Sequence, residues 1–135
     1  MNVGYGSFSP LVCFDIVFGE MVRKDVKSSN YLINVSNDTW FGNSFGPYQH
    51  LEISRIRSIE NNIPIVRATN DGISALIDSK GTIVDYMGKG NSGILHVKLV
   101  PTDVRTFYNN YGNLLLYIYL FIVSIKLFFV RMRNA

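Results

Sequence analysis

The chain has 135 residues, of which 47% are hydrophobic and 17% are charged, and its mean hydropathy is +0.15. This length suits one small domain, and the composition excludes an intrinsically disordered chain. The net charge of +3 equals the contribution of Lys126, Arg131 and Arg133 near the C-terminus, because the other charges balance. A neutral domain with one positive end excludes a basic face for nucleic acid, so we expect no nucleic-acid partner.

The counts of cysteine and histidine restrict the chemistry further. Cys13 is the single cysteine, which excludes an internal disulfide framework and a zinc site with several cysteines. Two histidines, His50 and His96, are too few and too far apart in the sequence for a metal cluster. We therefore expect no metal and no other cofactor. The first ten residues, MNVGYGSFSP, lack the basic and apolar regions of a signal peptide.

Hydrophobic periodicity predicts strands and helices in an order that is typical of an α/β domain. A helix that starts at Pro47 is expected to bury Leu51, Ile56 and Ile59 on one face and to stop before Pro64. A glycine-rich loop, GKGNSG, reads as a flexible turn. The expected elements in chain order are a strand over 8–12, a short helix over 15–24, a strand over 31–35, a helix from 47 to about 60, and strands over 63–69, 73–78, 82–87 and 94–100.

The C-terminal segment predicts a transmembrane helix. Residues 114–130 read LLLYIYLFIVSIKLFFV, and a helix of this length spans about 25 Å. Tyr108 and Tyr111 precede the run, where aromatic rings favour a membrane interface. The positive residues that follow it predict a cytoplasmic C-terminus, with the preceding domain on the other side of the membrane. The alternative is a buried helix at the end of a soluble domain.

Cys13 is the first candidate functional residue, because it stands where a predicted strand gives way to a helix. The strand fixes its position, the turn exposes its sulfur, and helix N-terminal amides can stabilise a thiolate or an oxyanion. This is the arrangement that a nucleophile needs. The alternative is a buried cysteine that packs as a small hydrophobic residue.

The loop after the second strand, SNDTWFGNSFG, supplies further candidates. Asn37, Asp38 and Trp40 could shape a pocket beside the nucleophile, or they could form an Asx-turn with a packed ring. His50 could pair with Cys13 as a dyad, although a structural hydrogen bond is the preferred interpretation. Arg67 is interpreted as the partner of a buried ion pair, with a role in the site as the alternative.

Two segments carry a resemblance to a known family. The first is LVCFDIVFGEMVR, and the second is LINVSNDTWFGNSFGPYQHLEISRIRSIENNIPIVRATNDGISALID. With the hairpin and the terminal apolar helix, they resemble the bacterial apolipoprotein N-acyltransferases, membrane enzymes whose extracytoplasmic domain has the nitrilase (carbon–nitrogen hydrolase) fold. The resemblance implies an α/β chain: residues 1–107 would form the C-terminal half of a nitrilase-like αββα sandwich, and residues 108–135 one transmembrane helix with a short basic cytoplasmic end.

The resemblance also implies a reaction at the bacterial plasma (inner) membrane, with the domain on the periplasmic side. Cys13 matches the family's nucleophile, which would take an acyl chain from a phospholipid as a thioester. The acceptor would be the N-terminal diacylglyceryl-cysteine of a lipoprotein. The alternatives are a membrane-anchored amidase of the same fold, which uses water as the acceptor, and a non-catalytic remnant.

The chain departs from the family pattern at two places. The family has C-Y-E at the nucleophile, whereas this chain has Phe14 and Asp15 after Cys13, so these two residues are expected to support the nucleophile with altered contacts. The family's Glu base and its Lys lie well upstream, and residues 1–12 contain neither type. We therefore expect a C-terminal fragment that is inactive alone. A separate chain could supply the missing half.

Overall fold

The structure, a computed structural model, describes residues 2–3 and 6–133. Its centre is a sheet with the strand order β1-β2-β3-β4-β5-β6. The strands are β1 (Asn2–Val3), β2 (Gly6–Val12), β3 (Tyr31–Asn37), β4 (Ile65–Asn70), β5 (Ser74–Ile77) and β6 (Ile83–Met87). The helical elements are the 3₁₀ helices η1 (Cys13–Val17), η2 (Val26–Ser28) and η3 (Asp38–Phe41), and the α-helices α1 (Gly19–Asp25), α2 (Gly46–Asn61), α3 (Phe107–Tyr111) and α4 (Leu114–Arg133). The predicted α/β class is confirmed.

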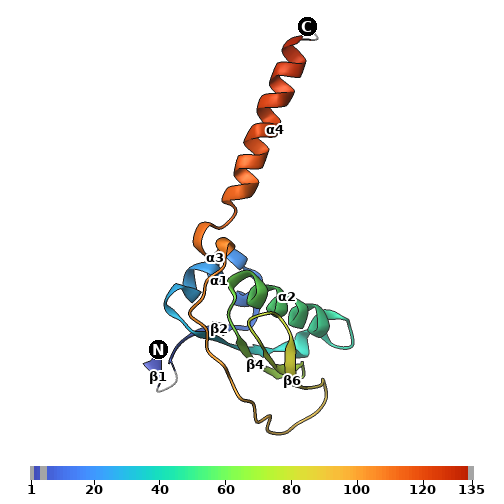
Figure 1. The fold of residues 1–135 in the computed structure, drawn as a ribbon. Helices are drawn as coiled ribbons and strands as arrows, with labels where there is room; N and C mark the ends of the chain where they lie inside the picture. Colours follow the sequence, from blue (N-terminus) through green and yellow to red (C-terminus); the bar gives the residue numbers. More distant parts are fainter. Residues whose placement is uncertain (1, 4–5, 134–135) are drawn as a thin grey trace.

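Strands β2, β3 and β4 run parallel, and β5 and β6 continue the sheet antiparallel. Helices α1 and α2 cover one face of this sheet (Figure 1). The apolar core lies under them, and it includes the fully buried side chains of Leu32, Ile65, Ile16 and Val22. Because the carboxyl ends of parallel strands meet at one edge, the residues after β2, β3 and β4 come together there.

The opposite face of the sheet is partly open. Val12 and Val35 are partners in the parallel register of β2 and β3, and their side chains are 62% and 45% exposed. An irregular segment over 88–106 crosses the other part of this face, where Val97 and Leu99 line a pocket with Tyr31. The sheet thus has helices packed on one face and exposed apolar side chains on the other. This arrangement is the one expected for half of a layered sandwich.

The predicted strand over 94–100 is wrong. The segment has the alternating pattern of a strand, and Ile94 and Val100 are 81% and 71% exposed. A strand needs a ladder of hydrogen bonds to a neighbour, and the hairpin partner of β6 is β5. The N–H of Thr102 donates to the carbonyl of Asn30 at 3.1 Å, just after the predicted strand ends.

The helix predicted over 15–24 is two elements, η1 and α1. Phe18 lies between them with φ −83° and ψ 86°, which is not helical, and Gly19 begins the second helix. Arg57 of α2 donates to the carbonyls of Ile16 and Val17, at 3.1 and 2.9 Å. These bonds satisfy carbonyls at the end of η1, so the break is stabilised from α2.

Helix α2 starts and stops as predicted, but its buried face differs from the prediction. Leu51 is buried, whereas Ile56 and Ile59 are 48% and 52% exposed. The side chains that face the sheet are largely polar, and they include the buried residues His50 and Ser54. Apolar periodicity therefore identified the helix, while hydrogen bonds to partners far along the chain decide its orientation.

A short connection joins the domain to α4. Thr106 caps α3, because its Oγ1 accepts from the N–H of Asn109 at 2.9 Å. The buried amide of Asn109 donates to Asn61 Oδ1 at 2.8 Å, and Arg23 donates to the Asn109 carbonyl at 2.9 Å. Gly112, with φ +61°, ends α3 two residues before α4 begins. The terminal helix therefore leaves from a segment that is bonded to both α1 and α2.

Helix α4 extends away from the domain (Figure 1). It has 20 residues, a length of about 30 Å, and none of its side chains is buried. Its length and composition suit a helix that crosses a membrane. The helix begins at Leu114, so Tyr108 and Tyr111 belong to α3. It continues past Val130 to Arg133, which places the positive residues in its last turn.

Candidate active site

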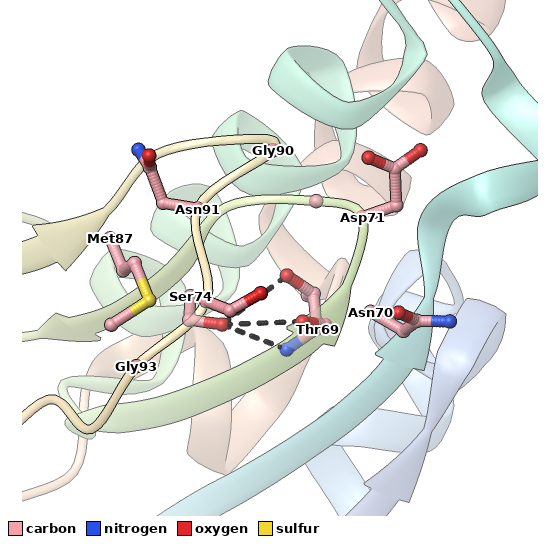
Figure 2. A pocket seen from close by; sticks show the side chains of 10 residues that line it. Thr69, Asn70, Asp71, Ser74, Met87, Gly90, Asn91 and Gly93 are labelled. Atoms are coloured by element: carbon pink, nitrogen blue, oxygen red, sulfur yellow. Dashed lines mark hydrogen bonds between the residues drawn. The ribbon is translucent and has the colours of Figure 1, made fainter.

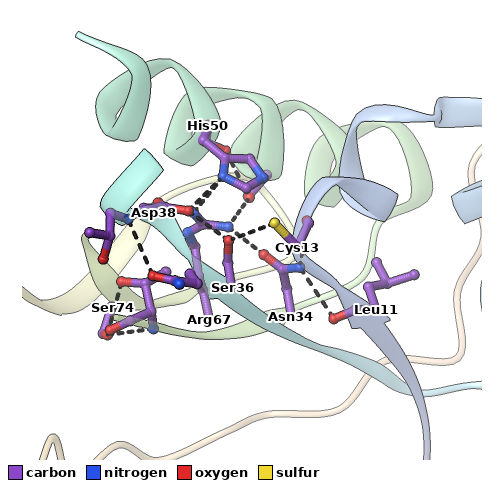
Figure 3. Close-up of polar contacts among 12 residues, drawn as sticks. Leu11, Cys13, Asn34, Ser36, Asp38, His50, Arg67 and Ser74 are labelled. Carbon is purple, nitrogen blue, oxygen red and sulfur yellow. Dashed lines mark hydrogen bonds and ion pairs between the residues drawn. The ribbon is translucent and has the colours of Figure 1, made fainter. Parts of the chain in front are cut away.

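Cys13 lies at the carboxyl end of β2, where the chain leaves the sheet (Figure 3). Its φ is +51°, in the left-handed region that residues other than glycine rarely adopt. The N–H of Val12 donates to Asp15 Oδ2 at 2.9 Å and so closes the turn from the other side. A strained backbone that is held by its neighbours is common at functional positions.

Two polar side chains of β3 contact Cys13 directly. Asn34 donates from Nδ2 to the carbonyls of Leu11 and Cys13, each at 3.3 Å. The Oγ of Ser36 lies 3.5 Å from Cys13 Sγ. The parallel register places Val12 opposite Val35, so the next residues along the two strands are Cys13 and Ser36. The cysteine side chain is half-buried, and β3 fixes both its backbone and its sulfur.

A buried carboxylate lies directly beyond Ser36. Asp38 is fully buried, and its Oδ2 accepts from Arg67 Nη2 at 2.7 Å. Its Oδ1 lies 3.0 Å from His50 Nδ1 and accepts from Ser36 Oγ at 2.6 Å. Arg67 also donates to the side chain of Asn34. The strands β3 and β4 and the helix α2 thus contribute to one network, which reaches Cys13 through Ser36 and Asn34 (Figure 3).

The charges in this network support one another. Burial opposes ionisation of Asp38, but hydrogen bonds from His50 and Ser36 and the charge of Arg67 outweigh it and lower the pKa of the Asp38 carboxyl. Burial lowers the pKa of the Arg67 guanidinium, against the opposing effects of Asp38 and of Cys13. Asp38 and Arg67 therefore form a buried ion pair within electrostatic reach of the cysteine.

The imidazole of His50 has one bonded and one unbonded nitrogen. Its Nδ1 contacts Asp38 and also Arg67 Nη2, at 3.0 Å each. Its buried Nε2 has no hydrogen-bond partner among the described residues. The rings of Phe14 and Phe41 lie 5.7 and 5.9 Å from the imidazole, and both residues line a pocket of about 80 Å³ beside it. His50 is thus a structural partner of Asp38, as preferred from the sequence, and Cys13 is not among its bonded partners.

A second pocket, of about 330 Å³, opens at the same edge of the sheet (Figure 2). The turn between β4 and β5 forms one side of it, and the loop over 88–93 forms the other. Its lining is polar, and the N–H of Thr69 donates to Ser74 Oγ at 3.0 Å. Of the described residues that line it, Asp71 alone is charged. Within residues 2–3 and 6–133, no group of three or more His, Cys, Asp or Glu side chains is arranged to hold a metal ion.

Comparison of the chain with known proteins identifies its family. Residues 1–109 match the model of the carbon–nitrogen hydrolases. The chain belongs to the carbon–nitrogen hydrolase family. The fold agrees, because the crystal structure of a carbon–nitrogen hydrolase from Helicobacter pylori superposes with a TM-score of 0.60 at 16% identity, over 68% of this chain and 40% of that one.

The curated relatives carry a more specific name. The apolipoprotein N-acyltransferase of Haemophilus influenzae is 39% identical over 133 residues, which is 95% of this chain and 26% of that protein. The enzyme of the same name from Vibrio parahaemolyticus is 41% identical over 110 residues, or 81% of this chain and 22% of that protein. The chain therefore spans about a quarter of the length of these relatives, and the resemblance seen in the sequence is confirmed at the level of the family.

The candidate residues of this carbon–nitrogen hydrolase chain have different surroundings. Asp38 is buried in the network, whereas Asn37 forms an Asx-turn, one of the two alternatives left open from the sequence, by accepting from the N–H of Thr39 at 3.3 Å. Trp40 is 87% exposed, so its ring does not pack against the domain. The alternative of an Asx-turn with a packed ring is therefore wrong for the ring. Phe14 is half-exposed beside His50.

Three polar residues of the network that reaches Cys13 were missed from the sequence or assigned only in part. Asn34 and Ser36 gave no signal, because polar residues at alternate positions of a strand usually face solvent. Both face α2 instead, and Asn34 is fully buried. Arg67 was interpreted as half of a buried ion pair, and the structure supplies Asp38 as its partner. The parallel register of β3 and β4, which pairs Asn34 with Arg67, is the signal that could have linked them.

Proposed function

We propose that this chain carries the nucleophile of an apolipoprotein N-acyltransferase. The observation that carries the proposal is Cys13, half-buried in a strained turn at the carboxyl end of a parallel strand, in a chain 39% identical to such an enzyme. In the first step, the thiolate of Cys13 attacks the ester carbonyl of a phospholipid. The thioester forms as the ester C–O bond breaks, and the lysophospholipid leaves as an alcohol, because a general base takes the thiol proton of Cys13 and returns it to the leaving oxygen.

In the second step, the α-amino group of a diacylglyceryl-cysteine attacks this thioester. The amide C–N bond forms as the C–S bond breaks, the general base takes one proton from the amine, and the sulfur of Cys13 leaves and recovers that proton as a thiol. Asp15 supports the nucleophile by closing the turn, and Asp38 supports it through Ser36. The exposed rings of Phe14 and Trp40 are proposed to contact the lipid substrates.

The proposed arrangement has two parts. Residues 1–107 form the partial catalytic domain on the periplasmic side of the plasma membrane, and residues 108–135 form the membrane anchor. The positive residues at the end of α4 support a cytoplasmic C-terminus. The Glu base and the Lys that the family uses are proposed to come from sequence outside these 135 residues, so the chain alone is expected to show no N-acylation.

A chimera tests the proposal. The segment of the Haemophilus influenzae enzyme that matches this chain is replaced by the chain, and the purified chimera is given phosphatidylethanolamine and a diacylglyceryl peptide. Mass spectrometry is expected to detect a thioester on Cys13 and the amide product, while the Cys13→Ala chimera yields neither. Amide formation by Cys13→Ala would contradict the proposal. A thioester that is released only to water would favour the amidase alternative.

A further inference from the structure

The hydroxyl of Ser36 has one hydrogen and two acceptors within reach. Asp38 Oδ1 lies 2.6 Å from Ser36 Oγ, and Cys13 Sγ lies 3.5 Å from it. A carboxylate is a stronger acceptor than a sulfur, and the contact to it is far shorter. The hydrogen of Ser36 therefore goes to Asp38, and a lone pair of Ser36 Oγ faces the cysteine.

The carboxylate cannot turn away from Ser36 without losing its other bonds. Its second oxygen is held by Arg67 at 2.7 Å, and His50 contacts the oxygen that Ser36 uses. All three side chains are buried. The network therefore fixes the direction of the Ser36 hydroxyl, in the way that outer hydrogen bonds orient the groups of a preorganised site.

We propose that Ser36 is a positioning residue that holds Cys13 as a thiol whose S–H points at Ser36 Oγ. This inference rests on the proposed function only in taking Cys13 as the nucleophile. In this contact the S–H of Cys13 is the donor and Ser36 Oγ is the acceptor, because the hydroxyl hydrogen of Ser36 is already bonded to Asp38. Removal of the proton to a base is then the step that releases the sulfur for attack.

Other charged groups lie on the elements packed around Cys13. Asp15 is in η1 itself and is bonded to the N–H of Val12, while Arg67 of β4 is paired with Asp38. His50 of α2 is bonded to Asp38, and Arg57 of α2 is bonded to the carbonyls at the end of η1. Among the residues that the structure describes, Ser36 supplies the hydrogen bond to the sulfur.

The single cysteine allows two direct measurements on the full chain in detergent. The first is the infrared S–H stretch, which falls in frequency when the thiol donates a hydrogen bond. The native chain is expected to show a lower frequency than the chain unfolded in urea, and Ser36→Ala is expected to shift it back. A native frequency equal to the unfolded one would overturn the proposal, even if no variant folds.

The second measurement is the rate of alkylation by iodoacetamide as a function of pH. Ser36→Ala removes the acceptor that favours the thiol, so its midpoint is expected to fall by roughly half a pH unit. Ser36→Thr, which keeps the hydroxyl, restores the native midpoint, and the exposed control Ser92→Ala leaves it unchanged. A midpoint in Ser36→Ala that stays the same or rises would overturn the proposal.

Neither measurement requires an acyl donor. If the chimera fails to acylate while the S–H bond to Ser36 is present, the proposed function fails and the positioning role stands. If acylation proceeds through Cys13 without that bond, the positioning role fails alone.

Discussion

The ion pair between Asp38 and Arg67 connects the chemistry of the site to the stability of the domain. Both side chains are fully buried, and their bond of 2.7 Å joins the first residue of η3, directly after β3, to the middle of β4. Burial of two charges is costly, and such a pair is tolerated where further hydrogen bonds satisfy both groups. Here Ser36 and His50 bond the carboxylate and Asn34 accepts from Arg67, while Arg67 Nε has no hydrogen-bond partner among the described residues.

Removal of the Arg67 guanidinium should therefore destabilise the domain strongly. Arg67→Ala leaves the Asp38 carboxylate buried without its counter-charge, and we expect a loss of about 3–5 kcal/mol in the free energy of unfolding. Urea denaturation followed by circular dichroism measures it. The control is Lys24→Ala, which removes an exposed contact of 4.0 Å to Glu20 and should leave the unfolding midpoint unchanged. Equal midpoints for both variants would contradict a structural role of the buried pair.

At this scale the sequence predicted some residues and missed others for a definable reason. Cys13 and Asp38 could be named as candidates because each follows a recognisable strand. Ser36 and Asn34 could not, because hydrophobic periodicity carries no information about which strand lies beside which. Their importance depends on the register between β2, β3 and β4, which brings them to Cys13 and Arg67.

At the scale of elements, the turn between β4 and β5 packs closely against the network. Gly72 is buried in this turn, and a Cβ placed there would lie 2.5 Å from Asp38 Oδ2 and 2.8 Å from Asp38 Cβ. Asp38 cannot yield, because Arg67 and His50 hold its carboxylate. The glycine is therefore needed for space between the turn and η3.

We expect Gly72→Ala to destabilise the domain by about 2–3 kcal/mol through overpacking. Thermal unfolding measured by circular dichroism should show the loss. Gly88→Ala is the matched control, because its nearest neighbour would be 3.5 Å away, at Asn91 Nδ2. A Gly72→Ala variant as stable as Gly88→Ala would show that the turn can move away from Asp38.

The elements themselves were largely predictable, and the errors have physical causes. Helix α2 was found from Pro47 and from its stop at Asn62, which adopts φ +49°. Its orientation was not found, because the buried Ser58 is satisfied by carbonyls that only the folded chain brings near, those of Ile63 and Asp78. The prediction of a strand over 94–100 was wrong for a related reason. A strand forms only where a neighbouring strand offers hydrogen bonds, and the sequence pattern does not reveal that neighbour.

At the scale of the whole molecule, α4 stands out because the other described residues do not cover its apolar side chains. None of its side chains is buried, although most of them are large and apolar. Exposure of this much apolar surface to water is unfavourable, and a bilayer would remove it. The helix length of about 30 Å matches the hydrocarbon thickness.

Ile122→Arg places a charge near the centre of this helix. We expect insertion to become less favourable by about 2.5–3.5 kcal/mol, so that alkaline carbonate extracts the variant from membranes while the native chain stays in the pellet. Ile122→Leu is the control and should behave as the native chain does. Equal retention of Ile122→Arg and Ile122→Leu would argue that something other than the apolar helix holds the chain at the membrane.

The bonds of Asn109 to α1 and α2 have a consequence for distance. Because α3 is fastened to the domain and only Gly112 and Asn113 separate it from α4, the domain has little freedom to tilt against its anchor. In a bilayer, the elevation of Cys13 over the headgroups would then be nearly constant. Under the proposed function, the ester carbonyl of the phospholipid would then have to move up to the sulfur of Cys13.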